Sequence, residues 1–212
     1  MLETLKREVH DALLELPKNN LVSLSSGNVS GRQGEYVVIK PSGVPYDQLS
    51  PFDLVVVDLE GNVVEGALKP SVDTATHLYM YRHMEGIQGI VHTHSTYATT
   101  FALLGEPLPV YLTEMADMLG ADVPVTDYAP VGDEAIGQEV VSKIDQSKAV
   151  LLRRHGVFTV GSSPTEALKV AVLVEHSAKI VHLAMLRGQP EPMPREDVEA
   201  AYRKYQNEYG QR

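Results

Sequence analysis

The chain contains no cysteine among its 212 residues, and this absence excludes several kinds of site at once. A disulfide framework, a thiolate metal site and a cysteine nucleophile are all impossible without a thiol. Any metal ion bound by this protein must therefore be held by nitrogen and oxygen ligands, because these are the donor atoms that remain.

The sequence is also poor in positive charge. It has 18 Lys and Arg against 28 Asp and Glu, a formal net charge of −10, and no run of basic residues. The electrostatic footprint that nucleic acid or anionic lipid requires is missing, and no apolar run is long enough to span a bilayer. We therefore expect a small soluble partner, with no nucleic acid and no membrane involved.

The N-terminal 20 residues have apolar residues at helical spacing, with acidic residues among them, which is unlike a signal peptide. A cytoplasmic location is therefore expected. Hydrophobic residues make up 43% of the chain, enough to bury one sizeable core. We expect a single domain covering residues 1–212.

Helix and strand signals alternate along the chain. Runs of β-branched residues at 36–40 and 54–66 indicate strands, and the second run is split by a turn that predicts a hairpin. A helix is expected from Pro164, with Ser163 as its cap and Glu166 completing a capping box. Further helices are expected at 74–84, 96–105 and 133–144, a buried strand at 86–95, and a strand pair at 148–161. The pattern predicts an α/β fold with a central, mainly antiparallel sheet flanked by helices.

Two histidines, His92 and His94, lie in the apolar stretch IVHTHS, where a side chain needs a partner. Residues two apart on a strand share a face, so these imidazoles could bind one ion, although hydrogen-bonded core histidines would give the same pattern. His155 ends another apolar run and precedes Gly156, which permits a sharp turn. Three histidines at strand ends match a catalytic zinc site that keeps one position open.

Six motifs together resemble the class II aldolase/adducin family, whose members include L-ribulose-5-phosphate 4-epimerases and L-fuculose-1-phosphate aldolases. The resemblance covers essentially the whole chain and implies that family's fold. It is carried by GNVS at 27–30, IKPSGVPYDQLSPFD at 39–53, EGALKPSVDTATH at 65–77, GIVHTHS at 89–95, RRHG at 153–156 and EYGQR at 208–212.

The resemblance implies a metal site. The family's histidines at the positions of His92, His94 and His155 bind a divalent ion, and an acid at the position of Asp73 lies at the same metal. One Zn2+ per subunit is expected, with Mn2+ or Co2+ as alternatives. Such an ion stabilises the charge that develops when a carbon–carbon bond next to a hydroxyl is broken.

The resemblance also implies a phosphate pocket. It places Asn28, Lys40, Ser42, Gly43 and Ser71 among the groups that hold a sugar phosphate. One position departs from the family pattern, because Val72 stands where relatives usually have a second serine, so that only its backbone N–H can bind. Each motif taken alone would be an ordinary turn or loop.

Three positions bear on the choice of reaction. Asp73 is shorter than the glutamate of the aldolases, Thr113 replaces their catalytic tyrosine, and Asp117 falls on the catalytic aspartate of the epimerases. Tyr209 matches a proton-transferring tyrosine that both subfamilies possess. We therefore favour a zinc-dependent 4-epimerase of pentose catabolism, working by retro-aldol and aldol steps.

The alternative is an aldolase that cleaves a ketose 1-phosphate, such as L-fuculose 1-phosphate, to dihydroxyacetone phosphate and an aldehyde. The short segment at 125–140 resembles the aldolases, and the tail lacks the extra histidine of the epimerases. A non-catalytic scaffold module, as in adducin, is disfavoured by the three histidines. A hydrolase using metal-bound water is disfavoured by the lack of an HExxH motif.

Two further expectations concern neighbours of the metal site. The resemblance implies a homotetramer with active sites at subunit interfaces, where the C-terminal tyrosine reaches the metal of a neighbouring subunit. Separately, His77 follows Asp73 by four residues on one helix face, which places it to orient that acid.

Overall fold

The computed structural model describes residues 2–208 and contains one seven-stranded sheet, in which every neighbouring pair of strands is antiparallel. The strand order is β4-β3-β2-β1-β5-β7-β6. The strands are β1 (Asn28–Gln33), β2 (Tyr36–Ile39), β3 (Val55–Asp58), β4 (Val63–Glu65), β5 (Gly89–Thr93), β6 (Ala149–Leu152) and β7 (Gly156–Gly161). The predicted antiparallel α/β fold is confirmed.

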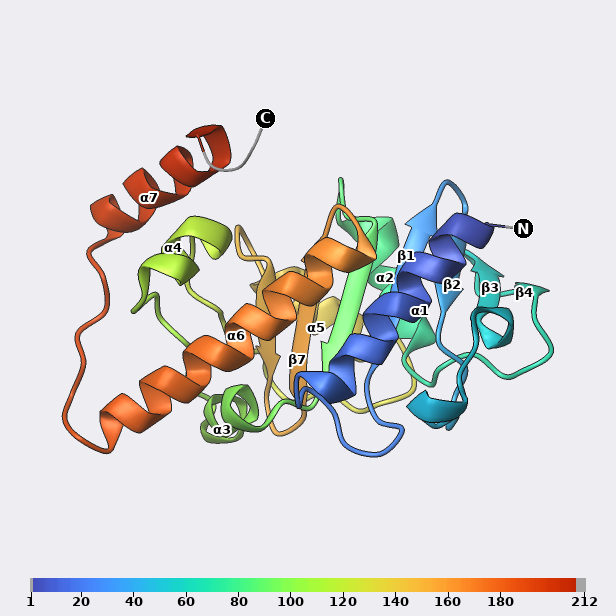
Figure 1. Ribbon diagram of the computed structural model, residues 1–212, viewed down its shortest axis with the longest axis horizontal. Coiled ribbons are helices and arrows are strands. Elements are labelled where there is room, and N and C mark those ends of the chain that lie inside the picture. Colours follow the sequence, from blue (N-terminus) through green and yellow to red (C-terminus); the bar gives the residue numbers. More distant parts are fainter. Residues whose placement is uncertain (1, 209–212) are drawn as a thin grey trace.

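Helices cover both faces of the sheet. In Figure 1, α1 and α6 lie across the front face, while α2 and α5 lie behind it. Helices α4 and α7 pack against each other at the end of the molecule farthest from β4. The helices are α1 (Glu3–Lys18), α2 (Thr74–His83), α3 (Thr96–Leu104), α4 (Thr113–Leu119), α5 (Ala135–Lys143), α6 (Pro164–Met185) and α7 (Arg195–Glu208), with two short 3-10 helices at Tyr46–Gln48 and Pro51–Asp53.

Strand residues alternate between the two helical layers because successive side chains point to opposite faces. Val38, Val56 and Val91 face α1 and α6, and belong to a cluster with Val9 and Leu13 of α1. Their chain neighbours face the other way, into a second cluster with α2 and α5 that includes Val37, Val57, Ile90, Val140 and Phe158. The central strands are thus buried on both faces, which gives the site a rigid support.

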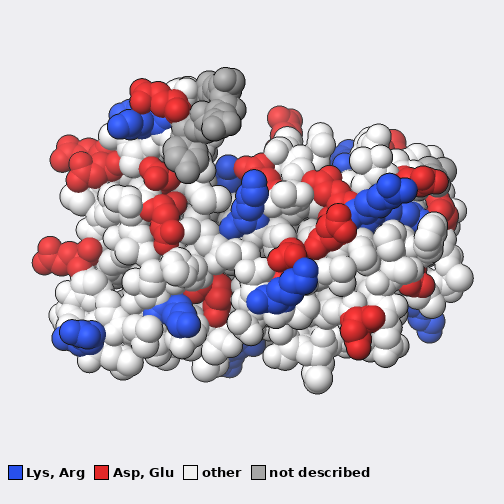
Figure 2. Space-filling view, viewed as in Figure 1, with Lys and Arg blue, Asp and Glu red and all other residues white. Residues whose placement is uncertain are grey.

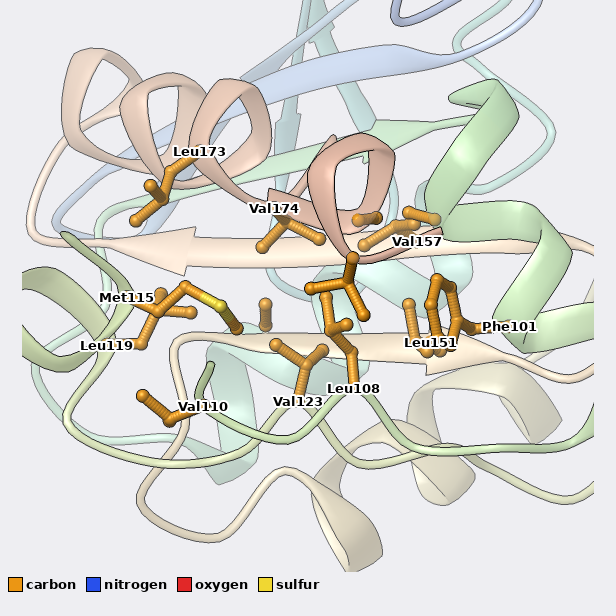
Figure 3. Close-up of a cluster of buried hydrophobic side chains, with 14 of the residues drawn as sticks. Phe101, Leu108, Val110, Met115, Leu119, Val123, Leu151, Val157, Leu173 and Val174 are labelled. Atoms are coloured by element: carbon orange, nitrogen blue, oxygen red, sulfur yellow. The ribbon is translucent and has the colours of Figure 1, made fainter. Parts of the chain in front are cut away.

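A third cluster joins α3, α4 and α6 to the last two strands (Figure 3). Phe101, Met115, Leu151 and Val174 meet there, and Val198 of α7 belongs to the same cluster. Burying a side chain of this kind stabilises the fold by about 1.5–3 kcal/mol. The cluster therefore fixes α4, the helix that carries Thr113 and Asp117, firmly against the rest of the protein.

The predicted start of α6 is correct, but its capping box is wrong in one detail. Ser163 Oγ accepts a hydrogen bond from the Glu166 N–H, as expected of a cap. The Glu166 carboxylate bonds instead to the N–H and hydroxyl of Ser162 and to Lys148. The acid therefore ties the helix start to the residue before β6.

Two surface properties bear on partners. Figure 2 shows Lys and Arg side chains interspersed with Asp and Glu across the described part of the face that α1 and α6 cover. Between residues 2 and 208, every helix is too short or too polar to cross a membrane.

Candidate metal centre and substrate pocket

Sheet register brings three histidines to one end of the central strands. His92 lies near the end of β5, opposite Asn28 on one side and Phe158 on the other. His155 lies in the tight turn that joins β6 to β7, and His94 follows two residues after His92. Since neighbouring strands are antiparallel, the end of β5, the start of β1 and the β6–β7 turn lie together at the same end of these strands.

The three imidazoles face one another closely. Their ring centroids are 4.8 Å apart for His92 and His94, 4.8 Å for His92 and His155, and 5.1 Å for His94 and His155. One nitrogen from each ring lies within 4.8 Å of the others, and the two Nε2 atoms of His92 and His94 are 3.1 Å apart. Tetrahedral zinc with bonds of about 2.0–2.1 Å needs donors roughly 3.3–3.4 Å apart. The donor set therefore fits a divalent ion.

Hydrogen bonding and burial prepare His92 as a ligand. Its Nδ1 lies 3.0 Å from the Val157 carbonyl oxygen, which can only accept, so Nδ1 carries the proton and Nε2 keeps its lone pair. Burial lowers the pKa of His92 well below the ordinary value, and the neighbouring His155 and His94 lower it further. Neutral imidazole is the form that binds metal.

The other two rings are also held neutral. Burial lowers the pKa of His94, as does nearby His155, while Asp73 acts in the opposite direction. Burial lowers the pKa of His155, again opposed by Asp73. All three histidines therefore have the protonation state of ligands near pH 7.

Glycines permit the close approach of the site's backbone. A Cβ on Gly156 would lie 2.2 Å from the Thr93 carbonyl oxygen and 3.0 Å from His94 Cδ2. Gly27 has φ +74°, and a Cβ there would lie 2.8 Å from the His92 carbonyl oxygen. The glycines of the RRHG and GNVS motifs thus let neighbouring segments close around the histidines.

A pocket of about 200 Å³ opens beside the histidines. Its walls include His94, His155 and the buried Asp73. Every residue predicted to hold phosphate also lines it, namely Asn28, Lys40, Ser42, Gly43, Ser71 and Val72. The sequence motifs therefore converge in space, although they are far apart in the chain.

The Asp73 carboxylate is oriented by Asn28, and the His77 side chain makes its hydrogen bond to Ser30 rather than to this carboxylate. Asn28 Nδ2 donates to Asp73 Oδ2 at 2.7 Å and to Ser71 Oγ at 3.2 Å. His77 instead bonds Ser30 through Nδ1 at 2.6 Å. Among the described residues, Asn28 Oδ1 is buried without a partner, which leaves an acceptor beside the acid.

Lys40 is nearly buried under the pocket. Its Nζ donates to the carbonyl oxygens of Ser25 at 3.2 Å and Pro41 at 3.3 Å. Burial lowers the pKa of Lys40. An ammonium group has three donors, so one remains for an anion in the pocket. A bound phosphate would also stabilise the charged form of Lys40, which burial disfavours.

Two predicted site residues are not brought to this pocket within one chain. Thr113 and Asp117 lie on α4, Thr113 is exposed, and neither lines the pocket. Tyr209 lies outside the described residues. The pocket of a single chain is thus lined by two of the three predicted metal-binding histidines, by Asp73 and by the predicted phosphate-binding residues, but not by the predicted α4 residues.

One supporting residue, Glu175, was not predicted from the sequence. Its two carboxylate oxygens accept hydrogen bonds from the Tyr97 and Ala98 N–H groups, each at 2.9 Å. Ser95, the residue at the cap position of α3, makes no side-chain cap bond. Glu175 of α6 therefore caps α3 from a distance and anchors the segment that follows His94. A lone glutamate within a long helix carries no local sign of this role.

Comparisons with known proteins agree with this geometry. The family model of the Class II Aldolase and Adducin N-terminal domain matches residues 7–182. L-ribulose-5-phosphate 4-epimerase UlaF of Salmonella paratyphi C is 37% identical over 198 residues, covering 86% of each chain. A solved L-fuculose 1-phosphate aldolase superposes with a TM-score of 0.91 at 33% identity, covering 96% of each chain.

A second solved structure, L-fuculose-1-phosphate aldolase from Thermus thermophilus, gives a TM-score of 0.77 at 30% identity and covers 86% of this chain and 95% of its own. The match of the family model, the identity to enzymes and the shared fold all lead to one assignment. The chain belongs to the class II aldolase and adducin family and is an enzyme of that family.

Proposed function

We propose that this enzyme is a zinc-dependent sugar-phosphate 4-epimerase that breaks and re-forms a carbon–carbon bond, as an L-ribulose-5-phosphate 4-epimerase of pentose catabolism would. The observation that carries the proposal is a cluster of three neutral histidines, two of which line a pocket together with a buried acid and the predicted phosphate-binding residues. The 37% identity to the Salmonella epimerase favours epimerisation over simple cleavage.

In this proposal His92, His94 and His155 hold Zn2+, with Mn2+ or Co2+ as alternatives, and Asp73 is either a fourth ligand or a proton carrier. The ion, when bound, supplies a Lewis acid that stabilises negative charge on a substrate oxygen. Asn28 fixes the Asp73 carboxylate, and the Val157 carbonyl fixes the His92 ring. The protein thus presents preorganised ligands rather than mobile ones.

The substrate's phosphate is proposed to lie at the other end of the pocket. Lys40 offers the remaining ammonium donor, and Ser42 and Ser71 offer hydroxyl groups. The loop at Gly43 and the backbone N–H of Val72 complete this set in the proposal. The Val72 side chain is 61% exposed, so it contributes an apolar rim rather than a hydrogen bond.

Proton transfer is proposed to depend on a second subunit. Asp117 and Tyr209 would act on the two faces of the aldehyde fragment after it rotates, and Thr113 would contact the substrate. Since Thr113 and Asp117 do not line the pocket of their own chain, we propose that they complete the pocket of a neighbour in a homotetramer. This arrangement explains how α4 can be functional while lying outside the metal pocket.

The second candidate is an aldolase that splits a ketose 1-phosphate. It is favoured by the TM-score of 0.91 to the L-fuculose 1-phosphate aldolase structure and by the short segment at 125–140. Both candidates use the same metal pocket. They differ in whether the aldehyde fragment is retained and turned, or released.

The test is a product analysis with the zinc-loaded protein. L-ribulose 5-phosphate and L-fuculose 1-phosphate are incubated separately, and the products are identified by NMR. Formation of the 4-epimer with no free fragments is expected. Cleavage to dihydroxyacetone phosphate and an aldehyde would select the aldolase. A His155→Ala protein serves as the control for contaminating activity.

A further inference from the structure

A buried polar chain lies directly behind the metal centre, between β1 and α2. Ser30 Oγ is 2.6 Å from His77 Nδ1 and 2.9 Å from the Tyr81 hydroxyl. Ser30 and His77 are both 0% exposed, and Tyr81 is 1% exposed. None of the three lines the substrate pocket, so the proposed chemistry leaves them without a role.

His77 contacts a metal-ligand histidine through one aromatic ring. It packs edge-on against Phe158, with ring centroids 5.4 Å apart at 67°. The same Phe158 ring stacks on His92, at 4.5 Å and 14°. The order His77, Phe158, His92 therefore forms a continuous packed row, and its last member is a predicted metal ligand.

His77 also belongs to the helix that carries Asp73. It lies one turn after Asp73, and its N–H donates to the Asp73 carbonyl oxygen at 3.0 Å. Asn28 and Ser30 are alternate residues of β1 and so share a face. One bonds the Asp73 side chain and the other bonds His77. Strand β1 thus holds the first turns of α2 at two successive points.

The His77 ring is held by its hydrogen bond to Ser30 and by its packing against Phe158. Among the described residues, His77 Nε2 is buried and has no hydrogen-bond partner. Burial lowers the pKa of His77 to about 3, with Asp73 acting against this shift and His92 adding to it. The ring is therefore neutral, and its Nδ1 forms a bond with Ser30 that requires no charge.

We infer that His77 is a positioning residue, locked by Ser30, that sets both His92, through Phe158, and Asp73, through α2, in the geometry that binds the metal ion. The inference rests on the proposed metal site. It adds two buried residues, Ser30 and His77, that hold the ligands in place without contacting the ion. Loosening the Ser30–His77 bond frees the ring, and both contacts of His77 with the site lose their fixed geometry.

The test compares four single substitutions and measures Co2+ binding, because the visible absorption of bound cobalt reports the ligands around the ion. Ser30→Ala and His77→Phe both remove the bond, and His77→Phe keeps an aromatic ring against Phe158. Tyr81→Phe is the matched control. It removes the buried hydroxyl that bonds the other side of Ser30 but leaves the Ser30–His77 bond intact.

We expect Ser30→Ala and His77→Phe to weaken cobalt binding by about 10- to 100-fold, the usual cost of losing a group that orients a ligand, and to alter the cobalt spectrum. Tyr81→Phe should lower the thermal midpoint but keep the parent's cobalt affinity and spectrum. His77→Asn, which keeps a polar atom near the Nδ1 position, should recover part of the affinity lost in His77→Phe.

A double-mutant cycle completes the test. If both substitutions act through one bond, adding Ser30→Ala to His77→Phe changes cobalt affinity little further. Parent-like affinity and spectrum in Ser30→Ala would overturn the inference, whatever its melting temperature. That outcome differs from failure of the proposed function, in which the parent protein itself binds no cobalt or acts on neither sugar phosphate. If His77→Phe does not fold, Ser30→Ala and Tyr81→Phe alone decide the question.

Discussion

The metal pocket and the α4–α7 corner differ in how much of a catalytic site one chain builds. At the pocket, strand register, a tight turn and two short loops bring the predicted ligands and phosphate groups together. At the corner, Thr113 and Asp117 lie on a well-packed helix away from that pocket. Metal binding can therefore be complete within a subunit, whereas proton transfer is proposed to need assembly.

The largest effect is expected at the metal pocket. Replacing His92, His94 or His155 with Ala removes one of three nitrogen donors, so bound zinc should fall to near zero and activity with it. The loss should exceed the roughly 10- to 100-fold cost of changing an outer group. Elemental analysis of the purified variants measures zinc. Full zinc occupancy in all three would show that the ion is held elsewhere.

Asp117→Asn should affect the reaction but not the metal. The amide keeps the size of the carboxyl group but cannot take up a proton, so epimerisation should fall by about two to four powers of ten. Zinc content and the thermal midpoint should match the parent. A parent-like epimerisation rate would make Asp117 a bystander and remove the main sequence argument for an epimerase.

Mixed subunits can show whether the pocket of one chain works with the corner of another. Asp117→Asn and His155→Ala proteins are unfolded, mixed and refolded together. If each pocket uses α4 of a neighbour, mixed assemblies contain some pockets with an intact metal set and an intact Asp117, and activity should reappear. If activity stays absent although mixed oligomers form, both residues belong to one chain's site.

Tyr209→Phe should reduce turnover by about 10²-fold or more as loss of an acid/base group, with zinc retained. Tyr209 lies outside the described residues, so only kinetics and metal analysis address it. Removal of residues 208–212 should give the same result. A truncated protein with full activity would show that Tyr209 has no catalytic role.

Much of the metal pocket could be predicted because its signals are local. His92 lies in β5 and His94 comes directly after the last residue of that strand, and Gly156 marks the turn after His155. The supports were missed because they depend on contacts distant in sequence. Glu175 meets Tyr97 across 78 positions, and Ser30 meets His77 across 47. His77 has the helical spacing that suggested a bond to Asp73, yet Ser30 on the facing strand is the partner.

A smaller effect is expected from Glu175→Ala. The change leaves the first N–H groups of α3 without their carboxylate acceptor, which should cost about 1 kcal/mol of unfolding free energy, as loss of a helix cap does. Because α3 begins just after His94, zinc affinity should weaken modestly as well. Chemical denaturation and metal titration measure the two effects. Lys169→Ala, an exposed residue of the same helix, is the control. Unchanged unfolding in Glu175→Ala would show that the remote cap contributes nothing.

The smallest effect is expected at the start of α6, far from both halves of the site, where the change should alter stability without altering catalysis. Burial raises the pKa of Glu166, but hydrogen bonds from Lys148 and Ser162 outweigh it and lower the pKa to about 2. A carboxyl group with a lowered pKa stabilises the fold above its ordinary pKa of 4.5 and loses this contribution as the pH falls towards 2.

Because the Glu166 and Lys148 side chains are both partly exposed, Glu166→Gln should cost only about 0.5–1 kcal/mol of unfolding free energy at pH 7. The difference from the parent should shrink between pH 4.5 and 2, which denaturation curves at several pH values would detect. Zinc content and turnover should stay at the parent's values, and a loss of zinc in this variant would mean that the α6 start and the metal pocket are coupled through the sheet.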